Sequence, residues 1–116
     1  MTRYKRGDVL LLPFPFSDAL AEKRRPAVVV SSGDYMASGI DIIVAMVTSR
    51  ARKATVVGDH RLNDWRAAGL VGPSTVRARL ATVNGKRVIK RLGAVSKPDM
   101  AAIEDGLRSA LQLHKK

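Results

Sequence analysis

Short apolar runs separated by turn-forming residues constrain the fold of this chain more than any other feature of its sequence. The runs are rich in Val, Ile and Thr, the β-branched residues that favour a pleated sheet. We predict strands over residues 8–14, 26–32, 41–49, 53–59, 74–83 and 86–95. Asn84-Gly85 joins the last two runs and is a strong hairpin signal, so residues 86–95 are expected to return beside 74–83.

One amphipathic helix is predicted at the end of the chain. Ser96 and Asp99 fit a capping box, and Pro98 falls in the first turn. Ile103, Leu107 and Leu111 then recur on one face, which we expect to be core. A mainly β chain with a C-terminal α-helix predicts a small antiparallel barrel or sandwich. With 116 residues, the chain is long enough for one domain, 1–116.

The charge balance points to a polyanionic partner. Twenty-one Lys and Arg against ten Asp and Glu give a net charge of +11, which favours nucleic acid over a plain solvated surface. No apolar run reaches the length of a membrane span, so we expect no membrane contact. Cysteine is absent, which excludes disulfides and thiolate sites and fits a cytoplasmic location.

Most catalytic motifs are missing. There is no glycine-rich phosphate loop, the two histidines are far apart in sequence, and the acidic residues are scattered. We therefore expect no metal and no cofactor. Arginine and hydroxyl groups remain, and positioned cations suit phosphoryl transfer, whose transition state carries spread negative charge. RNA supplies its own nucleophile, the 2′-hydroxyl, so its cleavage needs alignment, charge stabilisation and a proton path rather than a metal.

Several stretches in order resemble one known family. "RGDVLLLPFPFSD" followed by "KRRPAVVVSS", then "IIVAMVTS", "GLVGPSTVRARLATV" and "AVSKPDMAAIEDGLRSALQL", together cover nearly the whole chain. This pattern is similar to the MazF/PemK family, the mRNA-cleaving toxins of bacterial toxin–antitoxin modules. The Gly-Asp and Arg-Pro pairs are weak signals alone, and their spacing ahead of "MVTS" makes them specific.

The resemblance implies an SH3-like β-barrel that forms a homodimer. It also implies metal-independent cleavage of single-stranded RNA, leaving a 2′,3′-cyclic phosphate and a 5′-hydroxyl. A cognate antitoxin protein would hold the toxin inactive by covering the RNA groove. The sequence leaves open whether the toxin binds promoter DNA together with that antitoxin.

The resemblance also assigns roles to residues of this chain. Arg25 would be the catalytic arginine, and Thr48 would be its hydroxyl partner. We expect Arg24 and Ser49 to be auxiliary RNA contacts next to them, and loop 17–24 to border the groove.

Arg77 and Arg79 alternate with apolar residues on the predicted strand 74–83, so they should share one face. We expect phosphate contacts there, with a solvated face as the equal alternative. Some relatives carry an aspartate on this strand as a proposed general base, but no acidic residue lies in 74–83. The base is therefore unassigned between water, His60 and Asp18.

Two other functions fit the same features. The barrel could bind nucleic acid without cleaving it, or it could be a CcdB-style toxin that poisons a protein target. Fold alone does not separate these from a ribonuclease. Substitution of Arg25 does, because a nuclease would lose turnover while keeping much of its RNA affinity.

Overall fold

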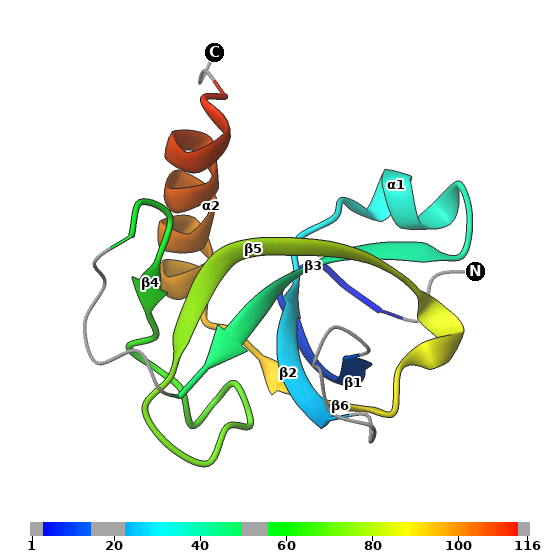
Figure 1. Cartoon of the computed structure of the whole chain (residues 1–116), viewed down its shortest axis with the longest axis horizontal. Helices are drawn as coiled ribbons and strands as arrows, with labels where there is room; N and C mark the ends of the chain where they lie inside the picture. The colour runs from blue at the N-terminus through cyan, green and yellow to red at the C-terminus, as the bar shows by residue number, and fades with distance from the viewer. Residues whose placement is uncertain (1–3, 15–22, 50–55, 114–116) are drawn as a thin grey trace.

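The computed structural model describes residues 4–14, 23–49 and 56–113. These residues form one curled antiparallel sheet with the strand order β4-β5-β3-β2-β1-β6 (Figure 1). The strands are β1 (Asp8–Phe14), β2 (Lys23–Val29), β3 (Asp41–Thr48), β4 (His60–Arg61), β5 (Thr75–Asn84) and β6 (Lys90–Ala94). The helices are α1 (Gly33–Ala37), the 3-10 turn η1 (Gly85–Arg87) and α2 (Lys97–Leu111). The prediction of a mainly β chain with a C-terminal helix is confirmed.

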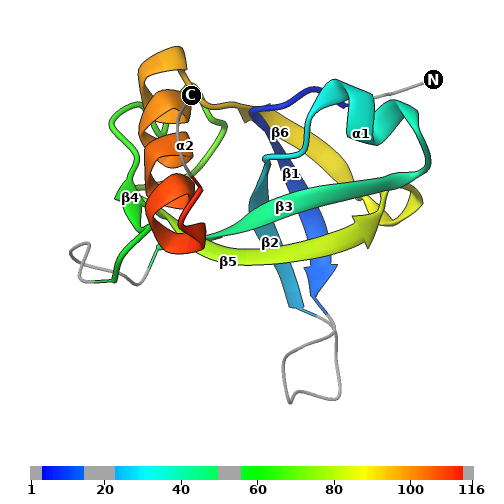
Figure 2. The same ribbon diagram turned by 90° about the horizontal axis from the view of Figure 1, so that it is seen from above.

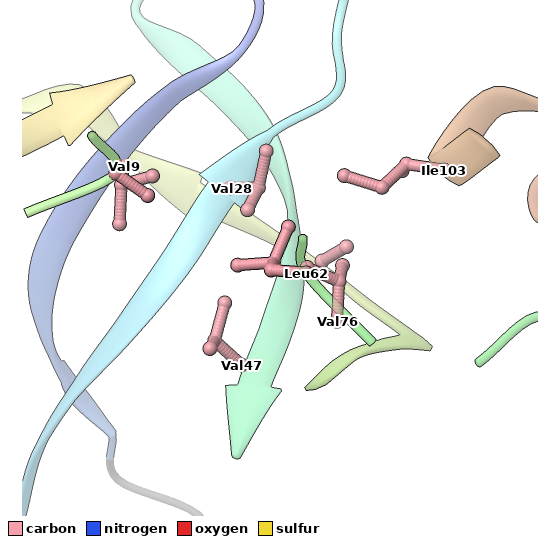
Figure 3. Packing of buried hydrophobic residues seen from close by; sticks show 8 residues of the cluster. Val9, Val28, Val47, Leu62, Val76 and Ile103 are labelled. Carbon is pink, nitrogen blue, oxygen red and sulfur yellow. The ribbon is translucent and has the colours of Figure 1, made fainter. Parts of the chain in front are cut away.

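The two faces of the sheet bury separate apolar clusters, because successive side chains of a strand point to opposite faces. The face under α2, here called the helix face, packs against Ile103 (Figure 3). Its strand residues are Val9, Val28, Ala45, Val47 and Val76. The face opposite α2, here called the arginine face, buries Leu10, Leu12, Ala27, Val29, Ile42 and Val44 together with Met36 of α1. Since both faces are covered, the strands appear in the sequence as almost continuous apolar runs.

Helix α2 begins as its capping signals predict. Ser96 is the N-cap, and its Oγ accepts a hydrogen bond from the Asp99 backbone nitrogen at 3.2 Å. Ile103 is buried, and Leu107 packs against the helix-face cluster. Leu111 is 50% exposed, so the expectation that it belongs to the core is wrong. The helix ends one residue later, at Gln112 in the left-handed conformation; Figure 2 shows α2 standing at one side of the sheet, with its last turn beside β5.

A close contact explains why a glycine lies inside α2. A Cβ added at Gly106 would lie 2.8 Å from the carbonyl oxygen of Gly58. Gly58 itself has φ of +97° and packs against Ala78 of β5. The turn that precedes β4 is thus clamped between α2 and β5, and it needs a glycine on both sides of the contact.

This turn also corrects the expected strand 53–59. Residues 56–59 form a turn, in which the Asp59 nitrogen bonds to the Val56 oxygen at 3.0 Å, and residues 53–55 lie outside the described residues. Positive φ at Gly58 breaks the extended conformation that a strand needs. The strand in this region is β4, which has only two residues.

The predicted hairpin at Asn84-Gly85 is also wrong. Gly85 is not among the residues with positive φ, which a two-residue hairpin turn requires. Instead, Asn84 Oδ1 accepts from the Lys86 nitrogen at 2.9 Å and starts η1. Strand β6 then crosses to the far side of the sheet and pairs with β1. This crossover curls the sheet into a half-barrel.

Strand β2 starts earlier than the predicted 26–32. Its pairing with β1 reaches back to Lys23, so Arg24 and Arg25 lie within the strand. Pro26 has no N–H to donate, and it is tolerated because the pairing of β2 with β3 begins only at Ala27. After the strand, Ser32 begins α1 rather than a simple turn, and its Oγ accepts from the Tyr35 nitrogen.

Candidate functional site

The register between β2 and β3 places Arg25 and Thr48 on the same face of the sheet, just beyond the last paired residues of the two strands. Ala27 pairs with Met46 and Val29 with Val44, so continuing the register by two residues sets Arg25 opposite Thr48. The ladder itself ends at Ala27, where the two strands stop pairing. Residues opposite each other in a sheet share a face. Arg25 and Thr48 therefore belong to the arginine face, and both are partly buried.

Arg25 stands at the border of the buried cluster of this face. On its other side it pairs with Leu12, which is fully buried. A cation at the edge of an apolar surface is less screened than one in bulk water, so its attraction for an anion is stronger. Arg24 and Ser49 are exposed. Arg24 precedes Arg25 in β2 and pairs with Pro13. Because side chains alternate along a strand, Arg24 points to the side of the sheet opposite Arg25.

Arg77 and Arg79 lie on the arginine face, as the alternation of the strand predicts. Strand β5 bulges where it pairs with β3, since Ala45 pairs with Leu80 but Val47 pairs with Val76. The bulge adds an even number of residues, so it leaves the alternation intact. Ala78 accordingly packs toward Gly58 and α2. Arg79 is exposed and Arg77 is partly exposed.

Two residues that the sequence interpretation passed over join this face. Thr75 of β5 pairs with Thr48 on one side and with Arg61 of β4 on the other. Thr48, Thr75 and Arg61 therefore form one row across β3, β5 and β4, on the same face of the sheet as Arg25. Thr75 is fully buried, whereas Arg61 is exposed. A two-residue strand has too little alternation for sequence reasoning to find Arg61.

His60 points away from this row. Its Nε2 lies 2.8 Å from Asp99 Oδ1 at the start of α2, on the helix face. The side chain is 18% exposed, so the imidazole is mostly buried. His60 is also a poor candidate for the general base, since it faces the opposite side of the sheet from Arg25. Asp18, the other side chain considered for that role, lies outside the described residues.

Asp99 is the best-satisfied acidic residue on the helix face. Its carboxylate accepts hydrogen bonds from the backbone nitrogens of Asn63 and Asp64, both at 3.0 Å, and from Ser96 Oγ at 3.2 Å. Burial alone would raise the pKa of Asp99, but the hydrogen bonds from Asn63, His60, Asp64 and Ser96 outweigh it and lower the pKa from 3.8. The network ties the 60–64 segment to α2.

The arginine face has a carboxylate of its own, contributed by Asp59. Asp59 Oδ1 lies 3.5 Å from Arg77 Nε. The carboxylate side chain is 4% exposed, and the arginine side chain is 32% exposed. No acid was found on the strand 74–83 by sequence, and Asp59 brings one to that face from the segment just before β4.

Two kinds of feature are absent from residues 4–14, 23–49 and 56–113. In these ranges no three His, Asp or Glu side chains gather in an arrangement that could hold a metal ion. Nor does any helix there combine the length and apolarity that crossing a membrane requires.

A cavity of about 340 Å³ lies between the sheet and the C-terminal half of α2. It is on the helix face, and its lining is mostly apolar: Val30, Ile43, Leu80, Leu107, Leu111 and Leu113, with Arg6, Glu104 and Arg108 around them. It holds none of the residues of the row, and its two arginines form ion pairs, Arg6 with Glu104 and Arg108 with Asp105.

Comparison with known proteins agrees with this architecture. The model of a family described as the PemK-like, MazF-like toxin of type II toxin–antitoxin systems matches residues 5–111. A sequence search of curated proteins finds no match.

Among solved structures, an endoribonuclease from a mycobacterial species, in complex with its cognate antitoxin, aligns with a TM-score of 0.76 at 20% identity, covering 97% of this chain and 99% of that one. MazF in a MazE–MazF complex from Deinococcus radiodurans aligns with a TM-score of 0.75 at 24% identity, covering 96% and 98%. The Mycobacterium tuberculosis toxin MazF-mt6 gives 0.75 at 16% identity, covering 93% and 99%. At these identities the likeness establishes the fold.

Proposed function

The chain belongs to the PemK-like, MazF-like toxins of type II toxin–antitoxin systems, and from that premise we propose that it is a sequence-specific, metal-independent endoribonuclease acting on single-stranded mRNA. The observation that carries the proposal is that Arg25 and Thr48 share one face of the sheet, where β2 and β3 stop pairing, and that this face also carries Arg77 and Arg79. Similar folds include proteins described as endoribonucleases. An mRNA substrate implies action in the cytoplasm.

The proposed reaction is internal transfer of a phosphate ester. The 2′-oxygen attacks the adjacent phosphorus while the bond from phosphorus to the 5′-oxygen breaks. The proton leaves the 2′-hydroxyl, and a proton is delivered to the departing 5′-oxygen, so a 2′,3′-cyclic phosphate and a 5′-hydroxyl result. Arg25 would stabilise the charge that builds on the phosphoryl oxygens through bidentate hydrogen bonds. The Thr48 hydroxyl would hold another oxygen of the same phosphate.

The partners follow from the same premise. A cognate antitoxin would cover the arginine face, and solved relatives are complexes of a toxin with its antitoxin. We further propose that the chain acts as a homodimer and that the complex with its antitoxin binds promoter DNA. The net charge of +11 suits the RNA and DNA partners.

The proposal is tested by incubating the purified protein with end-labelled single-stranded RNA in the presence of EDTA. Wild type is compared with Arg25→Ala and Thr48→Ala, each checked for folding by circular dichroism. We expect cleavage by wild type and its loss in both variants. Salt-sensitive RNA binding without cleavage of varied RNAs would favour the non-catalytic binding module. Neither binding nor cleavage would favour a toxin that poisons a protein target.

A further inference from the structure

The pair formed by Asp59 and Arg77 has a geometry that a surface ion pair lacks. Arg77 Nε is buried and its N–H donates no hydrogen bond, although Asp59 Oδ1 is 3.5 Å away. The arginine side chain as a whole is 32% exposed. The exposed surface of Arg77 therefore belongs to other atoms of the side chain, while Nε faces inward to the carboxylate.

The position of Asp59 follows from the register of β4. His60 pairs with Val76 and Arg61 with Thr75, so the next step of the same register sets Asp59 opposite Arg77. His60 points to the helix face, where it binds Asp99. By alternation, Asp59 and Arg61 on either side of it belong to the arginine face.

The Asp59 side chain is more deeply buried than the Arg77 side chain, so Arg77 is the partner that can meet a ligand and Asp59 is the partner that can orient it. The Asp59 side chain is 4% exposed, so it is poorly placed to meet a ligand itself. Arg77 is placed to do so. A carboxylate that holds Nε would restrict the rotation of a long side chain and reduce the entropy lost when its outer nitrogens bind an anion. The same logic makes outer partners orient the groups that touch a ligand.

We propose that Asp59 is a positioning residue that holds Arg77 toward a phosphate of the bound RNA other than the one that is cleaved. This inference rests on the proposed function. Thr48 pairs with Thr75 of β5, and Arg77 lies further along the same strand. Arg77 is therefore displaced from Arg25 and Thr48, so a neighbouring phosphate is the group that it reaches. Nε then faces Asp59, and the two terminal nitrogens face the phosphate in the bidentate manner of arginine.

The test uses the full chain and two RNAs. One is a cleavable single strand, and the other is the same strand with a 2′-deoxynucleotide at the cleaved position. Asp59→Asn keeps the shape of the side chain and removes its charge. We expect it to raise KM, and the Kd for the uncleavable RNA, about five- to tenfold, with kcat within about twofold of wild type. Arg77→Gln should raise them at least as much and lower the salt slope of binding by about one.

The double variant separates positioning from simple packing. If Asp59 acts through Arg77, Asp59→Asn adds nothing to KM once Arg77→Gln is present. A purely structural role would instead lower Tm with KM unchanged, and that result would overturn the inference. Additive effects on KM would overturn it as well.

Two further variants keep the test decisive. Asp105→Asn removes the same charge from an exposed ion pair on α2, with Arg108, and should leave KM within about twofold. Arg77→Lys leaves the buried Asp59 side chain itself and the local positive charge in place, so it remains usable if Asp59→Asn fails to fold. It keeps the positive charge but lacks Nε, and we expect at least half of the KM increase of Arg77→Gln on a logarithmic scale; wild-type KM would contradict the inference.

If wild type neither binds nor cleaves RNA, the proposed function itself has failed; cleavage by wild type with unchanged KM in Asp59→Asn defeats only the role of Asp59.

Discussion

On the helix face, the buried carboxylate of Asp99 accepts hydrogen bonds from Asn63, Asp64, His60 and Ser96. On the arginine face, the register of four neighbouring strands gathers Arg25, Arg61, Arg77 and Arg79, and the carboxylate described among them is that of Asp59. The first set of polar groups completes its hydrogen bonds by folding. The second set concentrates positive charge at one place on the surface. Folding alone accounts for the helix face, whereas the arginine face is better explained by an anion from outside.

Replacing Arg25 tests the second half of this comparison and should give the largest effect. We expect Arg25→Ala to lower kcat about 10²- to 10³-fold, the range for removing one fixed donor to a developing charge. The free energy of unfolding should change by less than about 0.5 kcal/mol, because the residue is only partly buried. Single-turnover cleavage and urea unfolding measure the two quantities.

The matched control is Arg108→Ala, which removes the same side chain from α2, where it pairs with Asp105. Its kcat should stay within about twofold of wild type. An equal loss of activity in both variants would mean that net charge, not the position of Arg25, governs cleavage.

Replacing Asp99 tests the first half. Asp99→Asn should lower the free energy of unfolding by about 3 kcal/mol, since several buried donors lose a charged acceptor. The variant Asp105→Asn, on the same helix and largely exposed, should lose less than about 0.5 kcal/mol. Urea unfolding at neutral pH gives both values, and similar losses would contradict the distinction between the buried and the exposed carboxylate.

The difference in stability between wild type and Asp99→Asn should depend on pH. The pKa of Asp99 in the folded state lies below 3.8 because its hydrogen bonds outweigh the effect of burial. A lowered pKa contributes stability that is fully present above 3.8 and is lost as the pH falls through the folded pKa. The difference in stability between wild type and Asp99→Asn should therefore be largest near neutrality and shrink below pH 3.8. A constant difference down to pH 2 would argue against an ionised Asp99.

Gly106→Ala tests whether the close contact between α2 and the Gly58 turn outweighs the helix propensity of alanine. Helix propensity alone favours alanine by about 1 kcal/mol. The added Cβ would lie 2.8 Å from the Gly58 oxygen, so we expect a net destabilisation of about 1–2 kcal/mol instead. Ser109→Ala, at an exposed position of the same helix, should be neutral or slightly stabilising. Thermal unfolding of both variants decides between propensity and contact; a stabilised Gly106→Ala would show that the turn moves away easily.

Arg79→Ala should give the smallest effect. Because Arg79 is exposed on the arginine face, its loss should raise KM for RNA about two- to fivefold, leave kcat nearly unchanged and reduce the salt slope of binding by about one. Affinity measured at several salt concentrations tests this. An unchanged slope would mean that Arg79 belongs to a solvated surface.

Local patterns in the sequence were sufficient for part of this fold. Strands β1, β3 and β5 and the start of α2 follow from alternation, capping and burial within each segment. The path of the chain after Asn84 does not follow from local patterns. The hairpin signal is overridden by the cap that Asn84 forms with Lys86 and by the pairing of β6 with β1. Strand β4 was missed because two residues carry no detectable period.

The candidate site divides in the same way. Arg77 and Arg79 could be proposed because they alternate with apolar residues on a recognisable strand, and Arg25 and Thr48 because the sequence around them resembles a known family. Asp59 and Arg61 could not, since their place on the arginine face depends on the pairing of β4 with β5. Likewise, nothing local indicates that His60 binds Asp99, which is distant in sequence and comes close only when α2 packs on the sheet.

The chemistry assigned to the arginine face has one most direct test. Once the cleavage position is mapped, wild type is incubated in EDTA with the cleaved RNA and with the same RNA carrying a single 2′-deoxynucleotide at that position, and the product ends are identified by mass spectrometry. The account predicts 2′,3′-cyclic phosphate and 5′-hydroxyl ends from the first RNA and no cut at that position in the second. Cleavage of the 2′-deoxy strand at the same place, or 5′-phosphate ends, would contradict attack by the 2′-hydroxyl and with it the role proposed for Arg25 and Thr48.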